Sequence, residues 1–318
     1  LAVPTPAPVW LNNDREVLPL NKNNHTLALI GPLASDKNSS LGNWRSQAIS
    51  NSATSVLEAM TNYSGNKLFY EQGVDLYYNN TDFHNRVNLN LDDRSEFNKA
   101  KTVAEKADIV VMVLGEEGYQ SGEGRSRTNI KLPGLQLELL KEIYEINKNI
   151  VLVVNSGRPL DLSWEDENIP TIVQAWQLGS RSGEAIAKVL YGDYNPSGKL
   201  TMSFPRNVGQ VPIYYNFKNT GRPSTSIEQV TNSGYADVEN SALYPFGHGL
   251  SYTKFSYTDV LLDKTELTLK SKITLSFKIK NIGTVKGTEI AQMYIRDVVG
   301  SIARPMRELK GFKVVELN

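Results

Sequence analysis

The sequence contains no cysteine and only three histidines, His25, His84 and His248. The absence of cysteine excludes thiol catalysis, disulfide bonds and thiolate metal sites. The three histidines are scattered along the chain, so a histidine-based metal site or a serine-type triad would require the fold to gather them. We therefore expect neither a bound metal nor a cofactor.

The sequence also lacks net charge and long apolar runs. Its 34 basic side chains balance 34 acidic ones, so no net field attracts nucleic acid or an anionic membrane. No apolar run approaches the ~20 residues of a membrane-spanning helix. The first ten residues, LAVPTPAPVW, have neither a basic segment nor a continuous apolar one, as a signal peptide would. We expect no nucleic acid and no membrane among the partners.

What the sequence does contain is a series of buried strands alternating with helices. Runs of apolar, mostly β-branched residues at Ile109–Leu114, Ile150–Asn155 and Thr171–Trp176 predict strands buried on both faces of a parallel sheet. Shorter strands are expected at residues 26–30 and 67–72, and helices at residues 53–63, 95–107, 135–147 and 184–190, with Ser95 as an N-cap. This alternation predicts an α/β sandwich over residues 24–205.

A polar loop follows the strand at Ile109–Leu114. Within twelve residues it carries three carboxylates and two guanidiniums, namely Glu116, Glu117, Glu123, Arg125 and Arg127. Ligands of open α/β sheets bind beyond the carboxyl ends of the strands, so chemistry is expected at this loop. The alternative is a solvated acidic loop without a ligand.

The rest of the chain predicts less regular structure. The proline-rich start should be extended surface chain as far as about Asn13, and residues 74–94 should form a polar surface excursion. From Phe255 the pattern has period two, which predicts a partial all-β, immunoglobulin-like sandwich of about four strands. The expected divisions are an N-terminal extension (1–23), the α/β sandwich (24–205), an irregular connection (206–254) and the β domain (255–318).

A glycine-rich turn, QLGSRSGEA, precedes the helix expected at residues 184–190. Helix N-termini bind anions, so this turn could form a phosphate cradle. The sequence has neither GxGxxG nor GxxxxGK[ST] here, which disfavours nucleotide binding. The hypothesis that the protein is a flavodoxin-like nucleotide or flavin binder is therefore supported by the expected topology alone.

Several longer segments resemble glycoside hydrolase family 3, particularly its bacterial periplasmic β-glucosidases. They are LPLNKNNHTLALIGPLASDKNSSLGNW, VVMVLGEEGYQSGEGRSRTNIKLP, VLVVNSGRPLDL, LYGDYNPSGKLTMSFPRNVGQVPIYY and YPFGHGLSYTKF. The resemblance spans about Asp14 to Leu317 and implies a mostly parallel, six-stranded αβα sandwich followed by a truncated fibronectin type III-like domain. It also implies a preceding (β/α)8 barrel that carries an Asp nucleophile, and this chain does not contain that barrel.

The resemblance assigns roles to individual residues. Glu123, in the run Ser121–Gly124, is similar to the family's general acid/base, and its flanking glycines let the backbone carry the carboxyl group toward the barrel. Trp44 is similar to an aromatic residue that stacks on the acceptor side of the sugar site, although it could equally anchor its loop. Arg125 and Arg127 are expected to orient Glu123 or to bind a sugar hydroxyl, unless they pair with the neighbouring glutamates.

Other charged residues are expected to be structural. Glu116 and Glu117 should bond the loop backbone or Arg125 and Arg127, because both lie directly at the strand end. We expect Arg158, in the turn SGRPLDL, to be structural as well, and His248 to pack at the junction with the last domain.

The function that the resemblance implies is part of a retaining, exo-acting β-glycosidase, a β-glucosidase in the first place. Its substrate would be an oligosaccharide or an aryl β-glycoside, and its location periplasmic or secreted. A homodimer is compatible with this assignment. Two alternatives stay open: a β-xylosidase of the same family, and a noncatalytic carbohydrate-binding or interaction module, since the nucleophile is absent from this chain.

Overall fold

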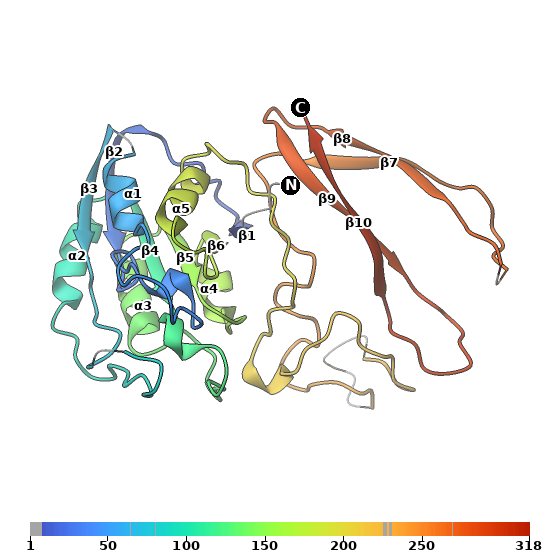
Figure 1. Ribbon diagram of the computed structural model, residues 1–318, viewed down its shortest axis with the longest axis horizontal. Coiled ribbons are helices and arrows are strands. Elements are labelled where there is room, and N and C mark those ends of the chain that lie inside the picture. The colour runs from blue at the N-terminus through green and yellow to red at the C-terminus, as the bar shows by residue number, and fades with distance from the viewer. Residues whose placement is uncertain (1–7, 64, 80, 225–227, 229–230, 269) are drawn as a thin grey trace.

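The computed structural model describes residues 8–63, 65–79, 81–224, 228, 231–268 and 270–318. Its main feature is a six-stranded sheet in the order β1-β6-β5-β4-β2-β3 (Figure 1). The strands are β1 (Val9–Asn13), β2 (Asn23–Ile30), β3 (Gly65–Glu71), β4 (Ile109–Gly115), β5 (Ile150–Asn155) and β6 (Thr171–Gln174). All neighbours pair in parallel except β1, which runs antiparallel to β6. The predicted fold class, a mostly parallel α/β sheet, is confirmed.

Helices cover both faces of this sheet (Figure 1). The helices are α1 (Val56–Thr61), α2 (Phe97–Glu105), α3 (Gln136–Ile146), α4 (Ser163–Asn168) and α5 (Ser182–Leu190). The apolar residues of α2 and α3 pack in one hydrophobic cluster, and those of α1 and α5 pack in another. The sheet therefore separates two cores, as the continuous apolar strands predict.

Successive residues of the central strands point into opposite cores. On β4, Val110 and Met112 belong to the cluster with α2 and α3, whereas Val111 and Val113 belong to the cluster with α1 and α5. The same alternation holds along β5. Side chains alternate between the faces of a strand, so a strand buried on both sides must be apolar at every position.

The beginning of the chain corrects one prediction. Val9–Asn13 is not extended surface chain but the strand β1, and Val9, Trp10 and Leu11 are all buried. The N-terminal extension expected over residues 1–23 is therefore wrong for these residues. Proline disfavours a central strand but not an edge strand, and the prolines here precede β1, which lies at the sheet edge beside β6.

Two details of the helices also differ from the prediction. The helix α2 begins after Glu96, not after Ser95, and its N-cap makes no side-chain hydrogen bond. Ser95 instead donates its backbone N–H to Asp93 at 2.9 Å. The sequence analysis missed α4, whose six residues SWEDEN are too few and too polar to show helical periodicity.

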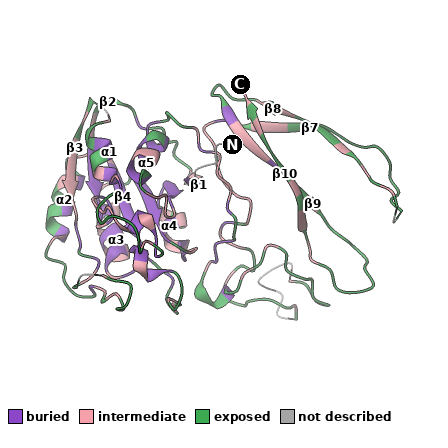
Figure 2. Cartoon of the chain, viewed as in Figure 1, coloured by how far each residue is buried: buried purple, intermediate pink, exposed green. Residues whose placement is uncertain are grey.

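The C-terminal part forms two antiparallel strand pairs. β7 (Phe255–Leu262) pairs with β8 (Leu275–Asn281), and β9 (Gly287–Ile295) pairs with β10 (Glu308–Leu317). Four strands from Phe255 onward agree with the predicted partial β-sandwich. Figure 2 shows that buried residues concentrate in the α/β part, while these four strands are largely intermediate or exposed.

Between α5 and β7 the described chain is mostly irregular. It contains the 3-10 helix η3 (Val208–Gln210) and isolated bridges that tie Phe204 to Tyr244 and Trp10 to Leu250. The second bridge fastens this connection to β1. Within the described ranges, no helix is long and apolar enough to cross a membrane.

Candidate functional site

The candidate site lies where four strands of the sheet end. The loop after β4 carries the carboxylates, and it meets the loops that follow β2, β5 and β6 through Asn43, Arg158 and Gln177. Parallel strands end at a common edge, which brings residues from distant parts of the sequence together.

The backbone at the end of β4 is held tightly. Gly115 has a φ of +137°, and a Cβ placed on it would lie 1.8 Å from the carbonyl oxygen of Asn155 on β5. The buried side chain of Gln136 accepts from the Gly115 N–H at 2.9 Å and donates to the carbonyl oxygens of Gly115 and Pro133, each at 2.8 Å. The first turn of α3 thus fixes the point at which the loop leaves the sheet.

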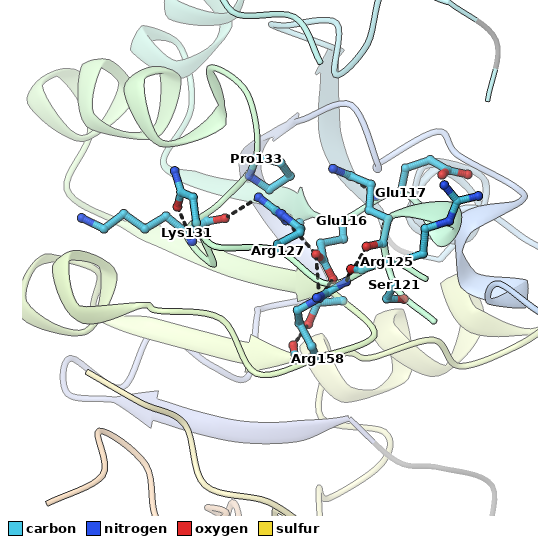
Figure 3. A network of polar contacts seen from close by, with 12 residues as sticks. Glu116, Glu117, Ser121, Arg125, Arg127, Lys131, Pro133 and Arg158 are labelled. Carbon is cyan, nitrogen blue, oxygen red and sulfur yellow. Dashed lines mark hydrogen bonds and ion pairs between the residues drawn. The ribbon is translucent and has the colours of Figure 1, made fainter. Parts of the chain in front are cut away.

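Glu116, the first loop residue, is a buried carboxylate held by two guanidiniums. Its side chain has no exposed surface, and its Oε1 lies 2.7 Å from Nη1 of Arg127 and 3.0 Å from Nε of Arg158. Figure 3 shows both arginines converging on this carboxylate. Two cations offset the cost of burying one anion, and the predicted ion pair between Glu116 and Arg127 is present.

Glu117 forms a second buried pair. Its Oε1 lies 2.7 Å from Nη2 of Arg45, whose guanidinium also stacks 3.9 Å from the ring centroid of Tyr119. Its Oε2 accepts from the Tyr119 N–H at 2.6 Å, in a capping box with Gln120. Burial lowers the pKa of Arg45, but the hydrogen bond and charge of Glu117, helped by Tyr119, raise the pKa overall. Glu117 thus bonds the loop backbone, as expected, but its arginine partner is Arg45 and not Arg125 or Arg127.

Glu123 differs from both of these carboxylates. It is exposed, and no hydrogen bond or ion pair holds its side chain within the described part of the chain. It stands between Gly122 and Gly124, whose φ angles of +108° and +69° fall in the region that favours glycine. The loop thus presents one free carboxyl group at its tip and keeps the other two in its base.

Two bonds fix the approach to this tip. The side chain of Asn43 donates to the carbonyl oxygen of Ser121, and Gln177 donates to the Ser121 hydroxyl at 3.2 Å. A Cβ on Gly122 would lie 2.8 Å from the Asn43 side chain. Position 122 therefore requires glycine for two reasons: its positive φ and its close contact with Asn43 in the loop after β2.

Trp44 lies next to this contact and is 69% exposed. Its ring centroid is 5.9 Å from that of Phe83, which in turn lies 6.4 Å from the ring of Tyr119. A tryptophan that anchors its loop in the core would be largely buried, and Trp44 is not. Its exposure leaves an aromatic face for a ligand. The three rings form an aromatic cluster beside the loop tip.

Arg125 and Arg127 have partners other than Glu123. Arg125 donates to the carbonyl oxygens of Phe83 and Asn85, the latter at 3.2 Å, and so ties the surface excursion to the loop. Arg127 pairs with Glu116. No contact joins either guanidinium to Glu123 among the described residues.

A cavity of about 270 Å³ opens beside the loop. Its lining residues come from the excursion and from the loop: Arg86, Val87, Leu89, Tyr119, Gln120, Gly124, Arg125, Ser126 and Arg127. It is one place where Arg125 and Arg127 reach solvent close to Glu123. No group of three or more His, Asp or Glu side chains suited to a metal ion occurs in the part of the chain that the structure describes.

Sequence reasoning missed two residues of this site, Arg45 and Phe83, and the contacts of a third, Arg158. Arg45 and Phe83 lie in segments without periodicity, and nothing in their neighbourhood marks them as partners of Glu117 and Trp44. Arg158 was expected to be structural, but its bonds to the loop could not be read from its own turn. The sequence offered one signal for these arginines: a glutamate buried at a strand end, as Glu116 and Glu117 are, needs a positive charge beside it.

Comparisons with known proteins match this chain to two family models. The family model described as "Glycosyl hydrolase family 3 C-terminal domain" matches residues 8–252, and one described as "Fibronectin type III-like domain" matches residues 289–318. A periplasmic beta-glucosidase from Salmonella typhimurium is 40% identical over 98% of this chain and 42% of its own length. A beta-xylosidase from Formosa agariphila is 36% identical over 98% of this chain and 41% of its own length.

A solved structure is also similar. The beta-glucosidase from Listeria innocua in complex with glucose matches with a TM-score of 0.87 and 34% identity, covering 98% of this chain and 41% of that one. The chain thus spans about two fifths of the length of the relatives that it matches.

Proposed function

Because the chain belongs to glycosyl hydrolase family 3, whose C-terminal domain model covers most of it, we propose that it supplies the general acid/base of a retaining, exo-acting β-glucosidase. Glu123 carries that role. The substrate is an oligosaccharide or an aryl β-glycoside with a terminal, non-reducing β-D-glucosyl residue. The α/β unit begins at β1, and residues 206–254 connect it to the β domain.

The observation that carries the proposal is the difference between the three loop carboxylates. Glu116 and Glu117 are buried and paired with guanidiniums, so neither is free to contact a substrate. Glu123 is exposed and free of such partners within the described residues. A general acid/base must reach the glycosidic oxygen and then a water molecule, which requires a carboxyl group without a fixed partner.

The mechanism assigns two steps to Glu123. It first protonates the departing oxygen while a nucleophile attacks the anomeric carbon, and it then removes a proton from the water that hydrolyses the glycosyl-enzyme. The nucleophile belongs at roughly 5 Å from it, on the opposite face of the sugar. With Glu116 and Glu117 engaged in ion pairs, we assign the nucleophile to a (β/α)8 barrel outside this chain.

The neighbouring residues serve the leaving-group side. Trp44, supported by Phe83, offers an aromatic face to the sugar or aryl group that departs. Arg125 and Arg127 contribute to substrate binding through the cavity that they line. Their remaining donors would face a hydroxyl group there.

The test is Glu123→Gln in the barrel-containing enzyme. We expect glycosylation to slow by roughly 10²–10⁴-fold for substrates with poor leaving groups, and less for activated aryl glucosides, which need little protonation. Azide should partly restore turnover and give a β-glycosyl azide, because an anion attacks the intermediate without a general base. Azide rescue with Glu116→Gln or Glu117→Gln, and none with Glu123→Gln, would refute the assignment.

A β-xylosidase is the second candidate. It is supported by the relative from Formosa agariphila that bears this name and matches nearly the whole chain. Comparing kcat/KM for 4-nitrophenyl β-glucoside and β-xyloside in the barrel-containing enzyme separates the two, while Glu123 keeps the same role in both.

A periplasmic location is also proposed, because the relative from Salmonella typhimurium is named a periplasmic beta-glucosidase.

The contrasting function is a noncatalytic carbohydrate-binding or interaction module. It predicts that Glu123→Gln leaves hydrolysis unchanged when the barrel is present.

A further inference from the structure

We propose that Arg158 is a positioning residue that holds the loop tip carrying Glu123 in its working place. This inference rests on the proposed role of Glu123. It starts from the bonds that Arg158 makes at both ends of the tip.

Arg158 reaches the residues on either side of the tip. Its Nη2 donates to the carbonyl oxygen of Gln120 and, at 2.8 Å, to the carbonyl oxygen of Arg125. These two carbonyl groups enclose Ser121–Gly124, so one nitrogen closes the base of the segment that contains Glu123. Figure 3 shows Arg158 beneath this part of the loop, beside Glu116.

The guanidinium is itself anchored. Its Nε lies 3.0 Å from Oε1 and 3.2 Å from Oε2 of Glu116, which is fully buried at the end of β4. The side chain of Arg158 is only 20% exposed. Arg158 follows β5, whose Asn155 pairs in register with Gly115 of β4. Through Arg158 and Glu116 the base of the tip is therefore anchored to the ends of two adjacent, buried strands, in addition to the bonds that Asn43 and Gln177 make to Ser121.

The need for such an anchor comes from the glycines. Gly122 and Gly124 give the tip the conformations it requires, but glycine also permits many others, which lowers the order of a free loop. An acid/base group displaced by about 1 Å loses much of its effect on rate. Closing the base of the tip restricts these alternatives and leaves the Glu123 side chain itself free.

Arginine suits this role better than lysine. A planar guanidinium can face a carboxylate with one nitrogen and two carbonyl oxygens with another, whereas an ammonium is a single point of charge. Arg158→Lys should therefore keep the pairing with Glu116 but lose the closure of the tip. A residue needed only to neutralise Glu116 would be replaced well by lysine.

The first measurement follows amide hydrogen exchange in this chain. We expect Arg158→Gln and Arg158→Lys to speed exchange by about tenfold at the hydrogen-bonded amides that flank the tip, those of Gln120 and Arg125, while the amides of β4 and β5 keep their protection. Arg181→Gln is the matched control, because Arg181 pairs with Glu184 on the exposed surface of α5. If Arg158→Lys folds and these amides exchange as in the wild type, the proposal is wrong.

The second measurement is kinetic and uses the barrel-containing enzyme. We expect Arg158→Lys to lower kcat/KM by about tenfold for poor leaving groups and less for activated aryl glucosides, at nearly unchanged thermal stability. Its azide rescue should be smaller than that of Glu123→Gln, because a glutamate is still present. Equal losses for all leaving groups would reject a positioning role.

The two measurements separate this inference from the proposed function. If Glu123→Gln shows no leaving-group dependence, Glu123 is not the acid/base and the proposed function fails. Faster exchange at the amides of Gln120 and Arg125 in Arg158→Lys would then still support the closure of the tip. If Glu123→Gln behaves as expected but Arg158→Lys shows no dependence on the leaving group, the positioning role fails alone.

Discussion

At the scale of single residues, the loop after β4 treats three glutamates in two ways. The two at its base are paired with arginines, Glu117 with Arg45 and Glu116 with both Arg127 of the same loop and Arg158, and the one at its tip is exposed to solvent. A carboxylate buried between guanidiniums is fixed in position, which suits a structural bond.

Trp44 tests the leaving-group side of the site. In the barrel-containing enzyme, Trp44→Ala should raise KM for aryl β-glucosides by roughly three- to tenfold, because it removes a stacking face worth about 0.5–1.5 kcal/mol. Stability should change by less than about 0.5 kcal/mol, since the side chain is 69% exposed. Ile49→Ala, at 79% exposure on the same loop, is the control, and a similar KM for both variants would count against Trp44.

Glu165 on α4 gives a prediction about pH. Burial, and then the charge of Asp161, raise its pKa to about 7, while Lys131 and Lys141 lower it. The folded state therefore holds a proton that the unfolded state loses near its ordinary value of 4.5. The resulting stability is fully present below pH 4.5 and is lost as the pH rises through about 7.

Glu165→Gln should remove this dependence, because the amide stays neutral. Relative to the wild type, the variant should gain about 2–3 kcal/mol in unfolding free energy between pH 5 and pH 8, measured by urea denaturation. Glu145→Gln, at an exposed position of α3, should show no such gain. Parallel pH profiles for the wild type and Glu165→Gln would contradict the prediction.

At the scale of elements, the edge strand β1 is more than an extension of the sheet. Trp10 is 3% exposed, its ring centroid lies 4.7 Å from that of Tyr252, and its carbonyl oxygen accepts from the Leu250 N–H at 2.8 Å. One residue thus joins the sheet edge to the chain segment that leads into the β domain.

Trp10→Ala should therefore cost about 3–5 kcal/mol of unfolding free energy, the usual effect of removing a large buried side chain. The measurement is chemical denaturation of this chain, with Trp44→Ala as the control because it makes the same chemical change at an exposed site. Equal midpoints for the two variants would show that β1 contributes little.

The elements that the sequence predicts well are those decided by their own residues. Ile109–Leu114 is apolar at every position, and so is β5 from Ile150 to Val154, as a strand buried on both faces requires. β1 was missed because its place depends on β6, far along the chain, and not on local periodicity. Arg45 and Phe83 were missed for the same reason, since their partners come from other loops. Glu116 and Glu117 both stand directly against a strand end, and the ion pair expected between Glu116 and Arg127 is present, whereas Glu117 pairs with Arg45.

At the scale of the whole molecule, this chain alone should not hydrolyse aryl β-glucosides. The described part of the loop after β4 offers one unpaired carboxyl group, Glu123, and one such group cannot both form a glycosyl-enzyme and release it. The measurement is release of 4-nitrophenol by the purified chain, with the barrel-containing enzyme as the positive control. Turnover that persists on purification and disappears in Glu123→Gln would contradict this expectation.

The division of the α/β part into two cores has a consequence for how substitutions combine. Val111 and Met112 are neighbours in sequence, yet they line different clusters, whereas Val111 and Val151 are register partners that share one. Free-energy changes add for residues without shared contacts and interact for residues that share a cavity. Energetic coupling in this sheet is therefore expected between register partners and between alternate residues of a strand, but not between successive residues, so epistasis between core positions follows the shared face rather than adjacency in the sequence.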